Sequence, residues 1–232
     1  MPRTAVPRVD LHMHSEFSAC AQDVTVEKDI LRAEMLGVTR LAITDHGDHL
    51  RPKWIPGYLL EVEGWRKGSS VDVLTGIEAQ ILPDGRPAVE KSLLKAFDVV
   101  IGGLHELPSQ GKAHGDALLP EYERAVLGAL EGGWMLILAH ATDVAWEKVS
   151  VPEDLARRLA ETARDKGVAV ELNFHHRDPT LPFLGACVEA GVRVTPTSDA
   201  HRLDEIGHYE WHAQMVERLY LSREPVWYTG PD

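Results

Sequence analysis

Short apolar runs recur along the chain about every 30 residues, and each is followed by polar residues and then by a segment with helical spacing. This alternation is typical of βα units on a parallel sheet. Seven runs fit the pattern, over residues 9–13, 40–44, 71–77, 97–103, 135–139, 168–172 and 192–197. Because no linker-like or low-complexity stretch divides them, we predict one domain over residues 1–232.

Apolar residues at helical spacing predict helices between the runs. The helix over 25–36 has Thr25 as a possible N-cap and Gly37 placed to end it. Further helices are predicted over residues 116–130, 152–166, 181–190 and 206–221. The segment 48–70 contains several prolines and is interpreted as a long loop before a helix that begins at Tyr58. Together these elements predict an α/β fold.

The residues that close the apolar runs are potential metal ligands. In the first run, alternation predicts Leu11 and Met13 on one face, so that His12 and His14 share the other. The later runs end in Asp45 and His46, Glu78, His105, His140, Asn173, and Asp199 with His201. The carboxyl ends of the strands meet at one mouth of a parallel barrel, so these side chains are expected in one pocket. One such histidine is usually an ordinary loop residue, but their agreement across strands favours a metal site.

Composition narrows the class of protein. Of 232 residues, 44% are hydrophobic and 26% charged, which is ordinary globular usage. No apolar run is long enough to cross a bilayer, and the first residues lack the apolar core of a signal peptide, so we expect a cytoplasmic protein without membrane contact. The formal net charge of -12 argues against binding of long nucleic acids. A small substrate or a nucleic-acid end fits better.

Taken together, the motifs resemble the PHP (polymerase and histidinol phosphatase) superfamily of metal-dependent phosphoesterases. The resemblance rests on His12-Met13-His14-Ser15, Thr44-Asp45-His46-Gly47, Gly76-Ile77-Glu78, Gly103-Leu104-His105-Glu106, Leu138-Ala139-His140 and Thr197-Ser198-Asp199-Ala200-His201. It implies a distorted seven-stranded (β/α)7 TIM-like barrel that holds up to three divalent ions. Histidine and carboxylate ligands suit zinc, manganese or iron, and the sequence does not choose among them.

The resemblance also implies which residues hold each ion. The first ion would be held by His12, His14, Glu78 and Asp199. The second would be held by His105 and His140 with Glu78 bridging, and the third by His46 and His201. A further ligand of the third ion aligns with Cys20, which departs from the usual histidine or aspartate. Either Cys20 binds as a thiolate, or Asp23 reaches in, or the third site is weak. Because some family members carry a cysteine here with an acidic residue close behind, Asp23 is slightly preferred, although it could equally cap the following helix.

Several divalent ions would leave the pocket cationic, which implies an anionic substrate. The expected mechanism is in-line attack on phosphorus by a water or hydroxide that bridges two ions. Asp199 could orient this nucleophile, and Asp45 is expected to support a ligand from behind. Candidates for substrate binding are Arg177, His176 and Arg202, although each could be an ordinary loop residue.

The leading hypothesis is a histidinol-phosphatase-like phosphomonoesterase that acts on a small phosphorylated metabolite at a trinuclear site. A nuclease or nucleotide phosphodiesterase of the same superfamily is the alternative within this chemistry. A weakly active metal-binding PHP module that works through a partner protein is a third possibility, disfavoured because nearly all ligand positions are filled. An amidohydrolase-like enzyme is disfavoured because no lysine ends a predicted strand.

Overall fold

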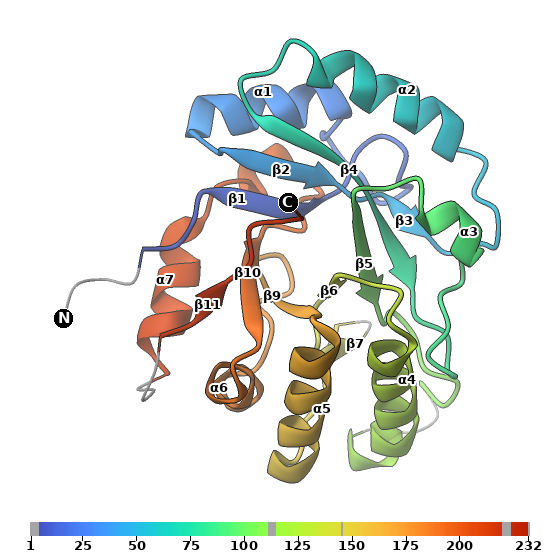
Figure 1. Ribbon diagram of the computed structural model, residues 1–232, viewed down its shortest axis with the longest axis vertical. Coiled ribbons are helices and arrows are strands. Elements are labelled where there is room, and N and C mark those ends of the chain that lie inside the picture. Colours follow the sequence, from blue (N-terminus) through green and yellow to red (C-terminus); the bar gives the residue numbers. More distant parts are fainter. Residues whose placement is uncertain (1–4, 111–114, 145, 220–223, 232) are drawn as a thin grey trace.

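The computed structural model describes residues 5–110, 115–144, 146–219 and 224–231. Its main feature is a curled sheet with helices on its outer side (Figure 1). Within the nine-stranded sheet the strand order is β1-β2-β4-β5-β6-β9-β10-β11, with β3 paired to β4, and every pairing is parallel. The strands are β1 (Val9–Met13), β2 (Arg40–Ile43), β3 (His46–Gly47), β4 (Asp72–Gln80), β5 (Val99–Gly103), β6 (Ile137–Leu138), β9 (Ala169–Asn173), β10 (Arg193–Thr197) and β11 (Val226–Trp227).

The predicted α/β barrel-like fold is confirmed. The seven predicted runs correspond to β1, β2, β4, β5, β6, β9 and β10. Two short strands, β3 and β11, extend the sheet beyond the prediction. A separate antiparallel hairpin, formed by β7 (Asp143–Val144) and β8 (Glu147–Lys148), was also not predicted.

The first and last of the seven main strands meet near their carboxyl ends. The backbone N–H of Asp199 donates to the carbonyl of His12 at 2.7 Å, and that of His14 donates to the carbonyl of Ala200 at 3.0 Å. Met13 and Ala200 form an isolated parallel bridge there. The curled sheet is therefore joined across β1 and β10 at the end where the candidate ligands lie.

Most helices agree with the predicted positions. They are α1 (Val26–Leu36), α2 (Ile55–Arg66), α3 (Lys91–Leu94), α4 (Leu119–Gly132), α5 (Glu153–Lys166), α6 (Leu181–Ala190) and α7 (Tyr209–Glu217), with short 3₁₀ turns η1 (Gly115–Leu118) and η2 (Leu203–Glu205). In α1 the Thr25 side chain accepts from Lys28 N–H, and Gly37 ends the helix at φ 69°. Residues 220 and 221 of the predicted last helix lie outside the described residues.

The start of one helix and the side-chain pattern of the first strand differ from the prediction for identifiable reasons. Helix α2 begins at Ile55 rather than Tyr58, because Pro56 lies in its first turn, where a missing N–H costs nothing. The alternation predicted for the first strand also breaks down. Leu11 packs in a cluster with Ala42 and Ile101, whereas Met13 belongs to the larger core, and the pairing of β1 with β2 is irregular between Asp10 and Met13.

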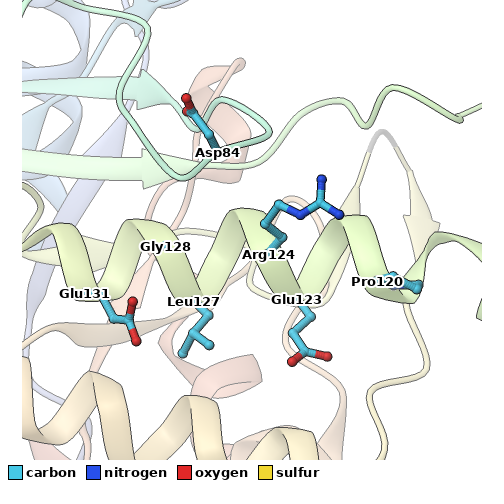
Figure 2. A pocket seen from close by; sticks show the side chains of 7 residues that line it. All are labelled: Asp84, Pro120, Glu123, Arg124, Leu127, Gly128 and Glu131. Carbon is cyan, nitrogen blue, oxygen red and sulfur yellow. The ribbon is translucent and has the colours of Figure 1, made fainter.

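A surface pocket of about 520 Å³ lies beside α4, under the turn that carries Asp84 (Figure 2). There the chain approaches the helix closely at two glycines: a Cβ on Gly85 would lie 2.3 Å from the carbonyl carbon of Gly128. Apart from Asp84, the pocket is lined by residues of α4. None of the candidate metal ligands lines it.

Candidate metal centre

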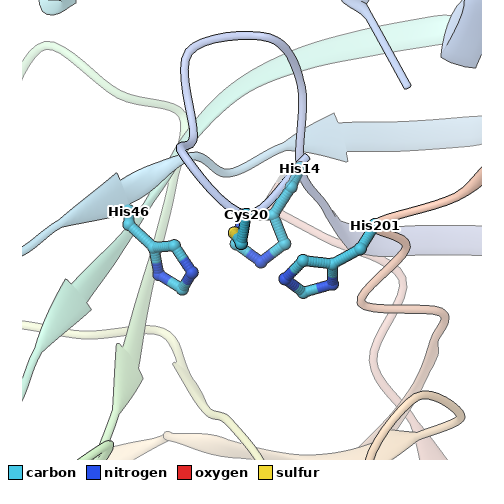
Figure 3. Close-up of side chains that lie close together, drawn as sticks. All are labelled: His14, Cys20, His46 and His201. Atoms are coloured by element: carbon cyan, nitrogen blue, oxygen red, sulfur yellow. The ribbon is translucent and has the colours of Figure 1, made fainter. Parts of the chain in front are cut away.

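The candidate ligands gather at the carboxyl ends of the strands. Four of them come from distant parts of the chain, and Figure 3 shows the rings of His14, His46 and His201 around the Cys20 side chain. In each group of possible ligands, the atoms able to bind a metal lie within 4.8 Å of one another. These groups are His14-Cys20-His46-His201, His12-His14-Asp199, His46-Glu78-His105, His140-His176-Asp199 and His175-His201-Glu205. The structure thus brings together the histidines and carboxylates that the sequence singled out.

In the group His12-His14-Asp199, all three residues are buried and one ring nitrogen lacks a hydrogen-bond partner. His14 Nε2 lies 2.9 Å from Asp199 Oδ1, and His12 Nε2 lies 3.4 Å from the same oxygen. His12 Nε2 is also 3.5 Å from Glu78 Oε2. His12 Nε2 has no hydrogen-bond partner among the residues that the structure describes. A buried polar atom left unpaired in this way is costly, and a bound cation would satisfy it.

Glu78 lies between His46, His105 and His140. Its Oε1 lies 3.1 Å from His105 Nε2 and 3.0 Å from His140 Nε2, and its Oε2 lies 2.8 Å from His46 Nδ1. The carboxylate reaches this position because Gly103 on β5 has no side chain: a Cβ there would lie 2.2 Å from Glu78 Oε1. Glu78 could therefore bridge two ions.

Cys20 and Asp23, the two alternatives for the last ligand of the third ion, lie in different surroundings. The Cys20 side chain is exposed and lies with His14, His46 and His201 (Figure 3). Asp23 instead accepts a hydrogen bond from the backbone N–H of Leu203 at 2.9 Å, and its own carbonyl accepts from Lys28 Nζ. Thr25, rather than Asp23, caps α1. The geometry thus favours Cys20 as the fourth member of this group.

Most of the candidate imidazoles are held by the protein through Nδ1, whereas His46 directs Nδ1 at Glu78. In five of them, the protein contacts Nδ1, so that in the neutral ring Nδ1 carries the proton and the Nε2 lone pair is free to bind a metal. These contacts are His12 to Glu171 at 2.6 Å, His14 to Ser18 at 3.2 Å, His105 to Gln80 at 2.5 Å, His140 to the Asp143 carbonyl at 3.3 Å, and His201 to the Asp199 carbonyl at 2.9 Å.

Asp45 lies behind this centre. Its Oδ1 accepts from the Ser15 N–H at 2.9 Å and from the Ser18 hydroxyl at 2.6 Å. Because the Ser18 hydroxyl donates to Asp45, its oxygen is left to accept from His14 Nδ1. Asp45 is therefore linked to His14 through Ser18, and its role in supporting a metal ligand stays a prediction.

The pKa shifts at this centre arise because buried acidic groups lie close to imidazoles. Burial by itself raises the pKa of the Glu78 carboxyl, but the charges of His105 and His12 hold it well below its ordinary range. Burial lowers the pKa of His46, yet the Glu78 carboxylate and the Cys20 thiol raise it to about 11. Burial raises the pKa of the Cys20 thiol, whereas hydrogen bonds with His201 and His46 lower it to about 7. Divalent cations would meet the same demand without protonated imidazoles, so the residues fit metal binding.

A model of the PHP domain matches residues 10–175. The chain belongs to the PHP domain family. A probable phosphatase of Edwardsiella ictaluri is 30% identical over 96% of this chain and 90% of its own length. A probable phosphatase of Acetivibrio thermocellus is 27% identical over 96% of this chain and 91% of its own.

The fold is also found in solved structures. A histidinol phosphate phosphatase from Lactococcus lactis, complexed with zinc, L-histidinol and phosphate, has a TM-score of 0.74 at 19% identity and covers 97% of this chain and 98% of its own. A putative histidinol phosphatase from Listeria monocytogenes has a TM-score of 0.64 at 17% identity, over 86% and 97% of the two chains. The predicted enzyme class is confirmed: this PHP protein is a metal-dependent hydrolase of phosphoric esters. In the described ranges, no helix combines the length and apolar character needed to cross a membrane.

The predicted substrate-binding residues of the PHP chain differ in their surroundings. The Arg177 guanidinium lies over the Phe174 ring, 3.5 Å from its centroid, and Arg202 pairs with Asp204 at 2.7 Å. Both arginines therefore have partners outside the groups of candidate ligands. His176 does lie at the centre, with Nε2 3.6 Å from Asp199 Oδ2.

Sequence reasoning missed Glu171, which is fully buried on β9. Its Oε1 accepts from His12 Nδ1, and its Oε2 accepts from the His140 N–H at 2.8 Å. One carboxylate thus positions two candidate ligands of the PHP centre. The available signal was a charged residue in an otherwise apolar strand, two positions before Asn173.

Proposed function

We propose that this PHP enzyme is a phosphomonoesterase that hydrolyses a small phosphorylated metabolite at a centre of up to three divalent ions. The proposal is carried by His12 Nε2, a buried atom without a hydrogen-bond partner among the described residues, which faces Glu78 Oε2 at 3.5 Å and Asp199 Oδ1 at 3.4 Å. Two electron-pair donors in such a position repel each other unless a proton or a cation lies between them. The surrounding histidines and carboxylates make a divalent cation the natural occupant.

The ligand sets belong to the same proposal. The first ion is assigned to His12, His14, Glu78 and Asp199. The second is assigned to His105 and His140 with Glu78 shared, and the third to His46, His201 and Cys20. A thiolate ligand favours zinc for the third ion, whereas nitrogen and oxygen ligands alone also accept manganese or iron. Zinc and phosphate in the structure of the Lactococcus lactis relative support this assignment.

Bound ions supply Lewis-acid stabilisation of phosphate charge and lower the pKa of water. The protein's own contribution is the placement of Asp199 beside His12 and His14. Asn173 Nδ2 donates to Asp199 Oδ2 at 2.9 Å, and this bond fixes the direction of the carboxylate. Asp199 is thereby positioned to accept a proton from the attacking water. His176, whose Nε2 lies 3.6 Å from Asp199 Oδ2, is the candidate to contact the substrate.

A small substrate is supported by the charge of the chain. The formal net charge is -12, so a long polyanion is repelled from the surface, whereas a phosphate that reaches the centre meets cations. The curated relatives are described as probable phosphatases over nearly the whole length of this chain.

The test combines elemental analysis with hydrolysis of two matched esters. Protein loaded with zinc or manganese is expected to turn over p-nitrophenyl phosphate faster than bis(p-nitrophenyl) phosphate. His12→Gln and Asp199→Asn each lower kcat/KM for the monoester on the order of 10³-fold or more, because each removes charge stabilisation at the reacting centre. His49→Gln is the control, since its side chain is 78% exposed and lies 3.5 Å from the carboxylate of the neighbouring Asp48.

Preference for the bis-ester would replace the phosphomonoesterase with the nuclease or phosphodiesterase alternative. Fewer than two bound ions together with no turnover of either ester would reject the proposal. The search would then turn to a metal-binding module that works through a partner protein.

A further inference from the structure

Cys20 differs from the other candidate ligands in its exposure. In the groups of possible ligands formed by the described residues, every other member is buried or half-buried, whereas Cys20 is exposed. Its sulfur lies within 4.8 Å of a ring nitrogen of each of His14, His46 and His201 (Figure 3). Cys20 is therefore the candidate ligand that a small solute can reach most directly from the solvent.

The turn that carries Cys20 is attached to the segment that carries His201. The Gln22 N–H donates to the His201 carbonyl at 3.0 Å, and the Leu203 N–H donates to Asp23 Oδ1 at 2.9 Å. Because these bonds involve the chain alone, they can hold the sulfur beside the imidazoles both before and after an ion leaves.

Cys20 is also the one ligand in the proposed sets that a mild oxidant can change. A metal ligand of this kind is a thiolate, and accessible thiolates react with peroxides, unlike imidazole nitrogens and carboxylate oxygens. The chain's other cysteine, Cys187 on α6, is fully buried in the hydrophobic core and provides an internal contrast.

We propose that Cys20 is a site of reversible oxidation by hydroperoxides, and that its oxidation releases the third ion. This inference rests on the metal centre of the proposed function. The thiolate sulfur attacks the terminal oxygen of the hydroperoxide, so that a sulfur–oxygen bond forms as the oxygen–oxygen bond breaks. The sulfur loses two electrons and becomes a sulfenic acid. The other oxygen takes a proton from solvent and leaves as water or an alcohol.

Oxidation weakens the third site selectively. A sulfenic acid carries less negative charge on sulfur than a thiolate, and its added oxygen occupies space among the imidazoles. His46 and His201 are then the two assigned ligands left for the third ion. The ligands assigned to the first and second ions are all nitrogen and oxygen donors, so these ions stay bound.

A cellular thiol reverses the change. One thiol condenses with the sulfenic acid to give a mixed disulfide and water. A second thiol attacks this disulfide, which restores the Cys20 thiol and leaves the two small thiols joined as a disulfide. The third ion can then bind again.

The test follows modification and metal content together. Zinc-loaded protein is treated with a small excess of hydrogen peroxide, and dimedone traps sulfenic acid for peptide mapping. Dimedone labels Cys20 and not Cys187, and a chromophoric chelator detects the release of about one zinc ion per chain. Met35, which is 79% exposed, can also take up oxygen but does not react with dimedone. Glutathione followed by fresh zinc restores the original metal content.

Cys20→Asp is the deciding variant, because it offers an oxygen ligand that peroxide does not oxidise. It binds the third zinc ion and releases none on treatment with peroxide. Cys187→Ala is the matched control and responds like the unmodified protein.

Absence of label on Cys20, or label without release of zinc, overturns the inference. Equal release of zinc from Cys20→Asp and from the unmodified protein also overturns it, because another group would then be the target. Turnover of p-nitrophenyl phosphate by untreated, zinc-loaded protein is measured in parallel. No turnover rejects the proposed function, whereas turnover in a protein that does not respond to peroxide rejects only the oxidation of Cys20.

Discussion

Glu171 is a buried residue that holds two candidate metal ligands in place without belonging to the proposed ligand sets. Its two oxygens accept from His12 Nδ1, from the His140 N–H and from the Thr197 hydroxyl. A carboxylate behind an imidazole fixes the ring and increases its basicity. We therefore expect the strength of metal binding to depend on Glu171, through its contacts with His12 and His140.

We expect Glu171→Gln to weaken zinc binding about 10- to 100-fold, because the amide has one acceptor oxygen where the carboxylate has two. The measurement is competition for zinc against a chromophoric chelator. Glu61→Gln, an exposed change on α2, serves as the matched control. Unchanged zinc affinity in Glu171→Gln would contradict this account.

Substitution of Cys20 and substitution of Asp23 should have different effects on binding of the third ion. With cobalt in place of zinc, a thiolate ligand produces a sulfur-to-metal charge-transfer absorption, which carboxylate and imidazole ligands do not. We expect Cys20→Ser to abolish this band and to reduce the bound metal by about one ion. Asp23→Asn should preserve both, because its carboxylate is occupied by Leu203 N–H. Loss of the ion in Asp23→Asn would restore the alternative in which Asp23 binds it.

At the scale of elements, α1 contains a buried carboxyl without a partner. Neither oxygen of Asp29 has a hydrogen-bond partner among the described residues, although the residue is fully buried. Burial raises the pKa of Asp29 well above its ordinary value, and the nearby carboxylates of Asp45 and Glu16 raise it further. Because the folded-state pKa exceeds the unfolded one, the fold is favoured where Asp29 is neutral and loses stability as pH rises through the folded-state pKa.

Asp29→Asn removes that loss. We expect the free energy of unfolding to increase by about 1–3 kcal/mol at pH 8 relative to the unmodified protein, and by less at pH 5. Urea unfolding at the two pH values measures the difference. Glu27→Gln, an exposed change in the same helix, should show no such pH dependence. An equal gain at both pH values would mean that ionisation of Asp29 is not the cause.

The elements also show what the sequence predicts and what it does not. Long periodic segments such as α5 and α6 were predicted almost to the residue, because their apolar spacing and terminal glycines are local signals. The strands β7 and β8 have two residues each and show no periodicity, so the hairpin that they form could not be predicted. Glu171 was missed because its partners are distant in sequence, and only the fold brings them together.

At the scale of the whole molecule, the candidate metal centre brings several buried carboxylates close together. Glu78, Glu171 and Asp199 are all buried at one end of the sheet. Their mutual repulsion is relieved when cations bind the folded state, and this binding also stabilises the fold by mass action.

Removal of the metal should therefore destabilise the entire domain. At a free metal concentration 1,000 times the dissociation constant, one ion contributes about 4 kcal/mol. For a chain of this size each kcal/mol shifts the unfolding midpoint by about 2–4 °C, so we expect chelation to lower it by on the order of 10 °C. Scanning calorimetry before and after chelation, followed by reloading with zinc, measures this. A midpoint that does not move would contradict tight binding at the centre.

The hydrogen bonds that join β1 to β10 have a consequence for the order of assembly. His12 and Asp199, which share one proposed ion, lie on segments that pair directly, although 186 residues separate them in the chain. On the ribosome the first two histidines emerge early, but the acidic partner emerges only after most of the protein has been made. If His12 and Asp199 share an ion as proposed, its full ligand set is complete only late in synthesis of the chain.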